Sequence, residues 1–261
     1  MSLRSSGSGL VRDRTAEGLG GIAAAVRRSA RITGNQDEEN PMQIELYFAP
    51  GACSFVPHAG LEVVKAATGQ DFTPHMVKLH KGEHKTPEYL AMNPEGLVPV
   101  LKVDGHPLTQ IVAICDFMDR SFPQAGLLPS DAWARAQAMS RFAWMNNTVH
   151  PTFTHVFMPN KFTGDEAAQA AIKAHAIEQY RKHLGRIEHM VEHAGTPYLL
   201  GDRVSFLDAY ALTLLRWGGY AGIDPESLPK LWAHVQRVAD TAPVAAAIER
   251  ERLQLNVYKK A

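Results

Sequence analysis

The sequence predicts a small α/β domain followed by a larger all-α domain. Short stretches in which polar and apolar residues alternate lie between positions 43 and 109, and this period of two is typical of strands. Apolar residues at helical spacing fill nearly all of the chain after position 131. Between these regions lie turn-forming residues that are typical of a linker, namely Pro123, Gly126 and Pro129.

These changes of pattern divide the chain into four parts. The predicted parts are a disordered N-terminal extension at 1–41, an α/β domain at 42–122, a linker at 123–131 and an all-helical domain at 132–261. The extension lacks aromatic residues, is rich in Ser and Gly, and carries six arginines against two acidic residues in its first 35 positions. An organelle transit peptide is one explanation of this extension. Three others are together favoured over it: a disordered tail, an expression remnant, or a start codon placed upstream of Met42.

In the first domain, the elements are expected in the order β-α-β-α-β-β-α. Gln43 to Phe48 alternates polar and apolar residues as a strand does, and Ala49-Pro50-Gly51 ends it. Asp104-Gly105 is placed for a hairpin turn. The other elements are expected as a helix at 54–67, strands at 72–79, 97–103 and 106–109, a short helix at 87–92 and a helix at 110–121.

In the second domain, apolar periodicity predicts a series of helices. They are expected at 131–149, 165–194, 205–221 and 228–240, with a short helix near 243–251. Ser205 and Asp208 have the spacing of a capping box at the start of one of them, so their expected role is structural.

The composition limits the function classes. The 261 residues carry 27 Lys and Arg against 27 Asp and Glu, and this balance argues against a nucleic-acid-binding protein, which needs a basic domain. No long apolar run is present, so no membrane-spanning helix and no membrane partner are expected. Two cysteines cannot form a disulfide scaffold, and a reduced, cytoplasmic setting is therefore predicted.

Cys53 is the first candidate for chemistry. It follows a predicted strand that turns directly into a helix, so unpaired N–H groups and the positive end of the helix dipole are aimed at its sulfur. Both effects favour the thiolate and make a cysteine reactive. A half-buried turn cysteine without function is the alternative. Cys115 lies in an apolar helical stretch and is expected to be a packing residue.

One histidine motif, one proline and one single histidine also have ordinary structural explanations. His189 and His193 share one face of a predicted helix in a zinc-like motif, but this face is expected to point toward solvent, and no metal is predicted. A metal hydrolase is therefore the least favoured function. Pro99 interrupts an apparent strand and requires an edge, a bulge or a cis bond. His150 alone would be an ordinary histidine at a helix end.

Taken together, four motifs resemble those of soluble glutathione transferases, most closely the bacterial beta class. The resemblance covers about 42–250. The motifs are Ala49-Pro50-Gly51-Ala52-Cys53-Ser54, Asn93 to Leu101, Leu108 to Ile114, and Leu199 to Asp202 with Ser205 to Tyr210.

The resemblance implies a thioredoxin-like glutathione-binding domain, an all-α second domain and a homodimer. It implies that Cys53 contacts the glutathione sulfur, that the backbone of Val98 pairs with the cysteinyl part of the tripeptide, and that His150 lies near the thiol. The expected glutathione-binding residues are Cys53, Lys81, Leu97, Val98, Pro99, Gln110, Ile111 and Arg135. The expected catalytic residues are Cys53, His150 and Ser54, and the expected acceptor pocket consists of Phe142, Met145, Phe153, Phe157 and Trp217.

Two positions depart from the patterns of the family. Phe48 occupies the place of the catalytic tyrosine of mammalian-type classes, which leaves the Ser54 hydroxyl as the fallback activator. Ile111 stands where a serine is usual, and the missing hydroxyl removes one hydrogen bond to glutathione, on the order of 1 kcal/mol.

The predicted function is therefore that of a glutathione transferase. It would conjugate glutathione, as its substrate, to small apolar electrophiles in detoxification, or exchange thiols and disulfides through Cys53. A non-catalytic module of the same fold, which binds a ligand or another protein, is the alternative.

Overall fold

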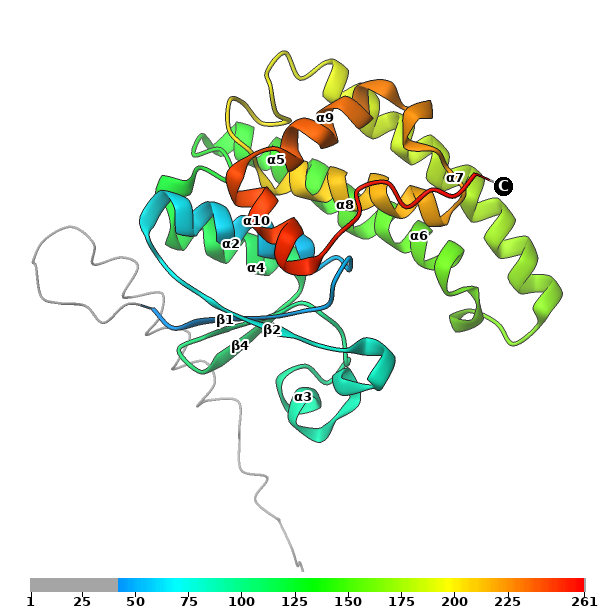
Figure 1. Cartoon of the computed structure of the whole chain (residues 1–261), viewed down its shortest axis with the longest axis horizontal. Coiled ribbons are helices and arrows are strands. Elements are labelled where there is room, and N and C mark those ends of the chain that lie inside the picture. The colour runs from blue at the N-terminus through cyan, green and yellow to red at the C-terminus, as the bar shows by residue number, and fades with distance from the viewer. Residues whose placement is uncertain (1–41, 261) are drawn as a thin grey trace, which may run out of the picture. The chain divides into compact units, whose positions relative to one another are not determined.

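The computed structural model describes residues 42–260, so the extension predicted at 1–41 lies outside the described residues. The described residues contain a four-stranded mixed sheet with helices of both predicted domains on one side of it (Figure 1). The strands are β1 (Ile44–Phe48), β2 (Thr73–Met76), β3 (Val100–Val103) and β4 (His106–Thr109), arranged in the order β2-β1-β3-β4.

The central strand β1 buries its alternate residues Ile44, Leu46 and Phe48, which explains the period of two in the sequence. It pairs in parallel with β2 and antiparallel with β3, and β3 pairs antiparallel with β4. Asp104 and Gly105 both have positive φ at the β3–β4 turn, which confirms the predicted hairpin. β3 begins at Val100, later than predicted, because Pro99 has no N–H to offer the ladder.

Along the C-terminal part of the chain, helices dominate, as predicted. They are α5 (Ala132–Trp144), α6 (His150–Phe157), α7 (Glu166–Glu192), α8 (Phe206–Tyr220), α9 (Pro229–Ala239) and α10 (Ala242–Glu251). The prediction that a helix ends at 149 was incomplete, because a π turn at Met145–Val149 continues into α6. Pro151 lies in the first turn of α6, where its missing N–H is tolerated.

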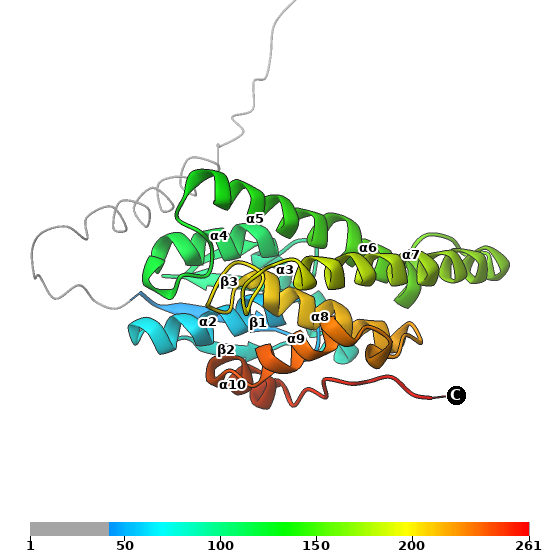
Figure 2. The same cartoon turned by 90° about the horizontal axis from the view of Figure 1, so that it is seen from above.

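The end of the chain returns to α8. After α10, the segment 252–260 runs along α8 (Figures 1 and 2). A Cβ atom at Gly219 would lie 2.7 Å from the Tyr258 backbone nitrogen, so the chain passes directly over α8 there. Among residues 42–260, no helix combines the length and the apolar character that crossing a membrane requires.

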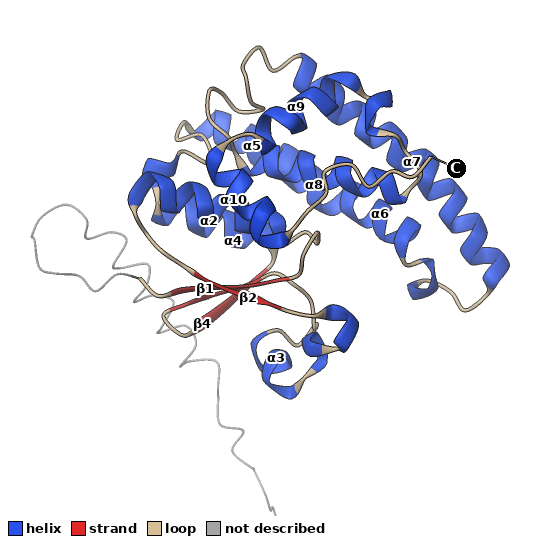
Figure 3. Cartoon of the chain, viewed as in Figure 1, coloured by secondary structure: helices blue, strands red, loops and turns tan. Residues whose placement is uncertain are grey.

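Two helices of the α/β domain cover one face of the sheet, and a third lies beyond the other face. α2 (Phe55–Thr68) and α4 (Ile111–Ser121) are on the side of the helical domain, whereas α3 (Pro87–Met92) is on the opposite side (Figure 3). α2 also packs against α8 so closely that a Cβ atom at Gly60 would lie 2.3 Å from the Phe206 ring. Most buried apolar side chains of both predicted domains consequently belong to one cluster, whereas Val77, Tyr89 and Val100 form a separate small cluster.

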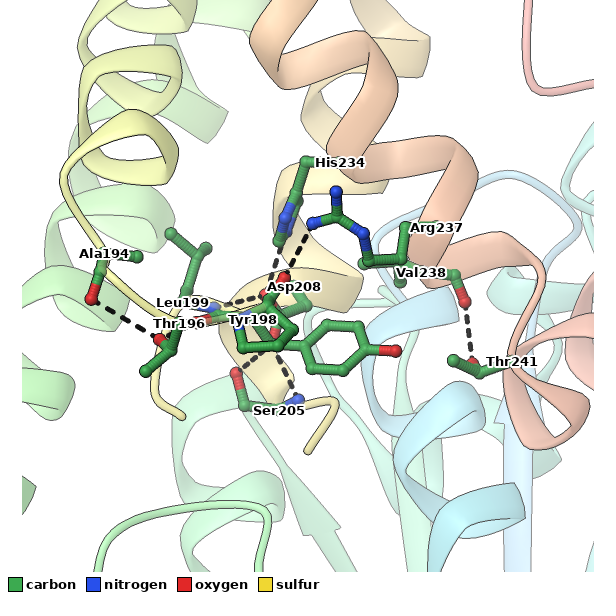
Figure 4. A network of polar contacts seen from close by, with 11 residues as sticks. Ala194, Thr196, Tyr198, Leu199, Ser205, Asp208, His234, Arg237, Val238 and Thr241 are labelled. Carbon is green, nitrogen blue, oxygen red and sulfur yellow. Dashed lines mark hydrogen bonds and ion pairs between the residues drawn. The ribbon is translucent and has the colours of Figure 1, made fainter. Parts of the chain in front are cut away.

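A buried carboxylate organises the start of α8 (Figure 4). Asp208 accepts hydrogen bonds from the backbone N–H and the hydroxyl of Ser205, at 2.8 and 2.5 Å, and from the Leu199 N–H at 2.9 Å. His234 Nε2 lies 2.9 Å from the same carboxylate, at ion-pair distance but outside hydrogen-bond alignment. The side chains of Ser205 and Asp208 therefore hold α8 against the preceding loop and α9, which is a structural role.

Candidate active site

The turn between β1 and α2 is held by hydrogen bonds between its own residues. The Ser54 hydroxyl accepts a hydrogen bond from the Ala49 N–H at 3.1 Å and donates one to the Ala49 carbonyl at 3.2 Å. Ser54 is fully buried. The expectation of Ser54 as a fallback catalytic hydroxyl is therefore wrong for this structure, because both of its hydrogen-bonding functions are used to close the turn.

Cys53 stands at the end of this turn, facing the segment before β3. Its Sγ lies 3.5 Å from the Val98 carbonyl oxygen, and the Val98–Pro99 peptide is cis. Burial of the sulfur raises the pKa of the Cys53 thiol to about 12, although the backbone N–H groups of Cys53 and Ser54 lower it. The expected helix-terminus effect is thus present, but desolvation outweighs it and the thiol stays protonated near neutral pH.

The backbone around Val98 is held open for a partner. The Tyr89 hydroxyl and the Asn93 side-chain amide both donate to the Leu97 carbonyl at 2.8 Å, which pins the residue before Val98. The Val98 N–H makes no hydrogen bond to another residue in the range 42–260. Leu97, Val98 and Pro99 therefore lie together beside Cys53, with an unused donor on the backbone.

The start of α4 offers a second set of unused donors. Gln110, the residue before the helix, has a φ of 72°, a backbone region that residues other than glycine rarely adopt. The first turn of α4 from Ile111 onward carries N–H groups that have no partner within the helix, which is a general anion-binding arrangement. The Glu95 carboxylate accepts a hydrogen bond from the Gln110 side chain at 3.4 Å. Sequence reasoning did not select Glu95, although it lies within a motif of the family.

Two charged residues expected at the glutathione site differ in how they are paired. Lys81 is exposed at the end of a single 3-10 turn, Leu79–Lys81, and forms no ion pair with residues 42–260. Arg135 instead donates to Asp119 at 2.5 Å and also pairs with Asp116, both on α4. The expectation that Arg135 binds glutathione is therefore corrected: its guanidinium is occupied in joining α4 to α5.

His150 is held by a short hydrogen-bond chain. The Tyr210 hydroxyl donates to Asn146 Oδ1 at 3.1 Å and lies 2.9 Å from His150 Nδ1. Since a hydroxyl has one proton, Tyr210 accepts from Nδ1–H, which leaves Nε2 as the acceptor atom of a neutral imidazole. Burial lowers the pKa of His150 to about 4, in agreement with a neutral ring.

Aromatic side chains lead from His150 to the surface. The ring of Trp217 lies 4.8 Å from those of His150 and Phe153, and Phe153 stacks on Phe157 at 5.6 Å. Trp217 Nε1–H also donates to the Gly51 carbonyl at 2.8 Å, so these rings border the Cys53 turn.

The row of rings extends further at its exposed end but excludes two expected members. Phe157 is 60% exposed and neighbours the ring of Tyr220, 6.0 Å away, which sequence reasoning missed. Phe142 and Met145 are fully buried, and Phe142 stacks on Phe206 of α8. The prediction of Phe142 and Met145 in an acceptor pocket is therefore corrected, because both are core residues on the inner side of the helices.

A buried carboxylate links the last helix to the turn, and no sequence signal indicated it. Glu251 Oε2 accepts from the Gly51 N–H at 2.8 Å, and Oε1 lies 2.7 Å from His58 Nδ1. The partners are about 200 residues apart in sequence, beyond the reach of any local pattern.

The histidine motif on α7 lies at the surface. His189, Glu192 and His193 are all exposed, as the sequence predicts, with one potential ligand atom from each within 4.8 Å of the others. Such a cluster could hold a metal ion, but it shares no hydrogen bond with the residues around Cys53.

Family models match both parts of the chain. One described as "Glutathione S-transferase, N-terminal domain" matches residues 42–120, and one described as "Glutathione S-transferase, C-terminal domain" matches residues 152–251. The glutathione S-transferase GST-4.5 of Xanthomonas campestris pv. campestris is 34% identical over 221 residues, which cover 80% of this chain and 100% of the relative. The glutathione S-transferase GstA of Escherichia coli O157:H7 is 31% identical over 216 residues, covering 81% of this chain and 100% of the relative.

Solved structures agree with these relatives. A glutathione transferase homologue from Sulfitobacter with bound glutathione has a TM-score of 0.74 and 27% identity, and the match covers 81% of this chain and 99% of that one. The glutathione S-transferase from Xylella fastidiosa has a TM-score of 0.72 and 31% identity, with 81% and 100% of the two chains covered. The predicted fold class, a thioredoxin-like domain followed by a helical domain, is confirmed. The chain belongs to the glutathione S-transferase family.

Proposed function

We propose that the enzyme conjugates glutathione to small apolar electrophiles, and that Cys53 acts as a hydrogen-bond donor rather than as a nucleophile. The observation that carries this proposal is the Cys53 thiol, which lies 3.5 Å from the Val98 carbonyl and whose pKa burial raises to about 12. Disulfide exchange needs a thiolate, which is scarce at neutral pH when the pKa is so high. A neutral thiol, in contrast, can turn its one proton from the Val98 carbonyl to the sulfur of a bound glutathione and donate a hydrogen bond there.

Backbone groups and two charged side chains would bind the rest of the tripeptide. The Val98 N–H and carbonyl would pair with the cysteinyl backbone of glutathione, as a neighbouring strand does. The γ-glutamyl carboxylate would lie at the start of α4, against the N–H of Ile111. Glu95, next to Gln110, supplies the negative charge that the γ-glutamyl ammonium group requires. Lys81, exposed and without an ion-pair partner among residues 42–260, is the candidate for the glycyl carboxylate.

In this reaction, the glutathione thiol loses its proton to solvent and its sulfur attacks the electrophile. Donors aimed at that sulfur stabilise the thiolate and lower the pKa of bound glutathione. His150, neutral near pH 7, is too weak a base to keep the proton, and its Nε2 would accept a hydrogen bond only from the glutathione thiol before the proton leaves. Phe153, Phe157 and Trp217 provide apolar surface for the acceptor.

Substitution of Cys53 tests this role. Cys53→Ser keeps a donor and is expected to retain kcat/KM for conjugation within about threefold, whereas Cys53→Ala is expected to lose about tenfold, the equivalent of one hydrogen bond. The pH profile of kcat/KM should move to higher pH by about one unit in Cys53→Ala alone, because the thiolate of bound glutathione loses a donor.

The nucleophile hypothesis gives a different result. If Cys53 attacks disulfides, mass spectrometry after incubation with oxidised glutathione shows a glutathione adduct on the wild type, and both variants lose thiol exchange completely. Rapid adduct formation at neutral pH would contradict the donor role.

We also infer a homodimer and a cytoplasmic location. The family resemblance supports the dimer, and the balanced charge and few cysteines support the location. Sedimentation equilibrium measures the first directly, and a monomer at micromolar concentration would contradict it. Localisation of a tagged chain tests the second.

A further inference from the structure

Arg216 on α8 places a positive charge beside the Cys53 turn. A Cβ atom at Gly51 would lie only 2.7 Å from Arg216 Nη1, so the guanidinium lies directly against this turn. The Nε–H donates to the Gln254 carbonyl at 2.8 Å and Nη2 donates to the Tyr220 hydroxyl at 3.3 Å. Both partners are neutral. Among residues 42–260, no carboxylate oxygen lies within ion-pair distance of Arg216, whereas Arg135 and Arg250 are paired.

The acidic side chain that reaches this turn already has hydrogen-bond partners. Glu251 reaches Gly51 from the last turn of α10, but one of its oxygens accepts from the Gly51 N–H and the other lies against His58. Arg216 Nη1 is left with protons to donate and no protein acceptor in the described part of the chain.

Arg216 also lies at one end of the row of aromatic rings. Its guanidinium carbon is 5.6 Å from the centre of the Tyr220 ring, and that ring is 6.0 Å from Phe157. The next residue, Trp217, donates to the Gly51 carbonyl. An aromatic acceptor that lies on these rings, with its reacting carbon toward Cys53, therefore brings its substituents within reach of the guanidinium.

We propose that Arg216 makes the enzyme prefer, among electrophiles whose apolar part lies on these rings, those that also carry a carboxylate. This inference rests on the proposed conjugating function. The planar guanidinium can donate two parallel hydrogen bonds to a carboxylate, and an arginine that has no ion-pair partner keeps its full charge for this contact.

The inference is tested with a matched pair of acceptors, para-chloro-meta-nitrobenzoate and its methyl ester. In both, the glutathione sulfur forms a bond to the ring carbon, the carbon–chlorine bond breaks, chloride leaves with the electron pair, and the thiol proton passes to solvent. Each kcat/KM is divided by the rate constant of the uncatalysed reaction, because the ester is intrinsically more reactive. The wild type is expected to favour the carboxylate at least tenfold, and this preference should decrease as salt is added.

Variants at position 216 distinguish a role of Arg216 in carboxylate recognition from a purely structural role. Arg216→Gln is expected to remove the preference without changing turnover of the ester more than about twofold, and Arg216→Lys should retain part of it because the charge remains. Arg186→Gln, on α7 above the Trp144 ring, removes an arginine elsewhere and should leave the preference intact.

The outcomes distinguish this inference from the function on which it rests. Equal normalised rates for the two acceptors in the wild type overturn the selection of carboxylates, while turnover of the ester still supports conjugation. Absence of turnover with both acceptors counts against conjugation itself. A rise in the KM for glutathione in Arg216→Gln with both acceptors also overturns the inference, since Arg216 would then bind glutathione. If Arg216→Gln does not fold, the wild type still tests the inference. The ratio of its normalised rates for the carboxylate and the ester, and the dependence of that ratio on salt, then show whether carboxylates are selected.

Discussion

Single residues near the turn show how burial overrides simpler electrostatic expectations. Cys53 stands at a helix start, and the N–H groups there do lower its pKa, yet the loss of solvent around the sulfur raises the pKa to about 12. The same cause acts in the opposite direction on His150, because burial disfavours the charged form of either group and lowers the pKa of an imidazole to about 4. Both side chains are therefore neutral at physiological pH.

The neutrality of His150 predicts a dependence of stability on pH. Its folded pKa is below the unfolded value, so the unfolded chain takes up a proton first, and the free energy of unfolding falls as the pH falls through about 6.5 toward 4. Between about pH 7 and about pH 5, the free energy of unfolding should fall by about 2 kcal/mol more in the wild type than in His150→Asn. The amide of this variant can still donate to Tyr210. Urea unfolding at the two pH values measures this difference, and equal losses would show that the imidazole is not desolvated.

Among the elements, α2 carries the closest packing between the two parts of the core. Gly60 allows α2 to approach α8, with Phe206 occupying the space that a side chain would need. Gly185 of α7 is also a helical glycine, but a Cβ atom there would meet nothing within 4 Å. The two glycines therefore have opposite structural roles, although their sequence contexts are both helical.

This contrast predicts opposite effects for the same substitution. Gly60→Ala should destabilise the protein by about 1–3 kcal/mol, because the added methyl group overlaps a buried ring and outweighs the gain in helix propensity. Gly185→Ala should stabilise it by about 0.5–1 kcal/mol through propensity alone. Denaturant unfolding of both variants measures these changes in the free energy of unfolding. An unchanged value for Gly60→Ala would contradict the prediction and mean that the Phe206 ring moves aside without loss of stability.

At the scale of the whole molecule, most buried apolar side chains of the α/β part and of the helical part belong to one shared cluster. α2 packs on both α8 and α10. An ion pair between Glu62 and Arg250, and a contact of 2.7 Å between His58 Nδ1 and Glu251 Oε1, also join α2 to α10. Such an arrangement favours cooperative unfolding, because opening either part would expose the core of the other.

Two probes in different parts test this cooperativity. All four tryptophans of the sequence follow position 131, whereas Cys115 is fully buried in α4 of the α/β part. In a Cys53→Ser background, tryptophan fluorescence and thiol labelling of Cys115 should give the same urea midpoint. Labelling of Cys115 at a clearly lower urea concentration would show that the α/β part unfolds by itself.

Local patterns were sufficient for most elements and for the position of Cys53. The period of two in β1, the Asp104-Gly105 turn and the helical periodicity after position 131 all act within a few residues, so the sequence alone predicts them. Predictions failed where local and tertiary preferences differ: Pro151 suggested the end of a helix, but a π turn carries the chain through it into α6.

The sequence by itself determined the fold class, the family and the turn that carries Cys53, because these depend on periodicity and on short contiguous motifs. Only the tertiary structure decided what each side chain does there. Ser54 closes the turn, Arg135 pairs with α4, Phe142 and Met145 enter the core, and Arg216 meets Gly51 across more than 160 positions of sequence. Burial and charge pairing arise from residues far apart in the chain, so no local pattern can contain them.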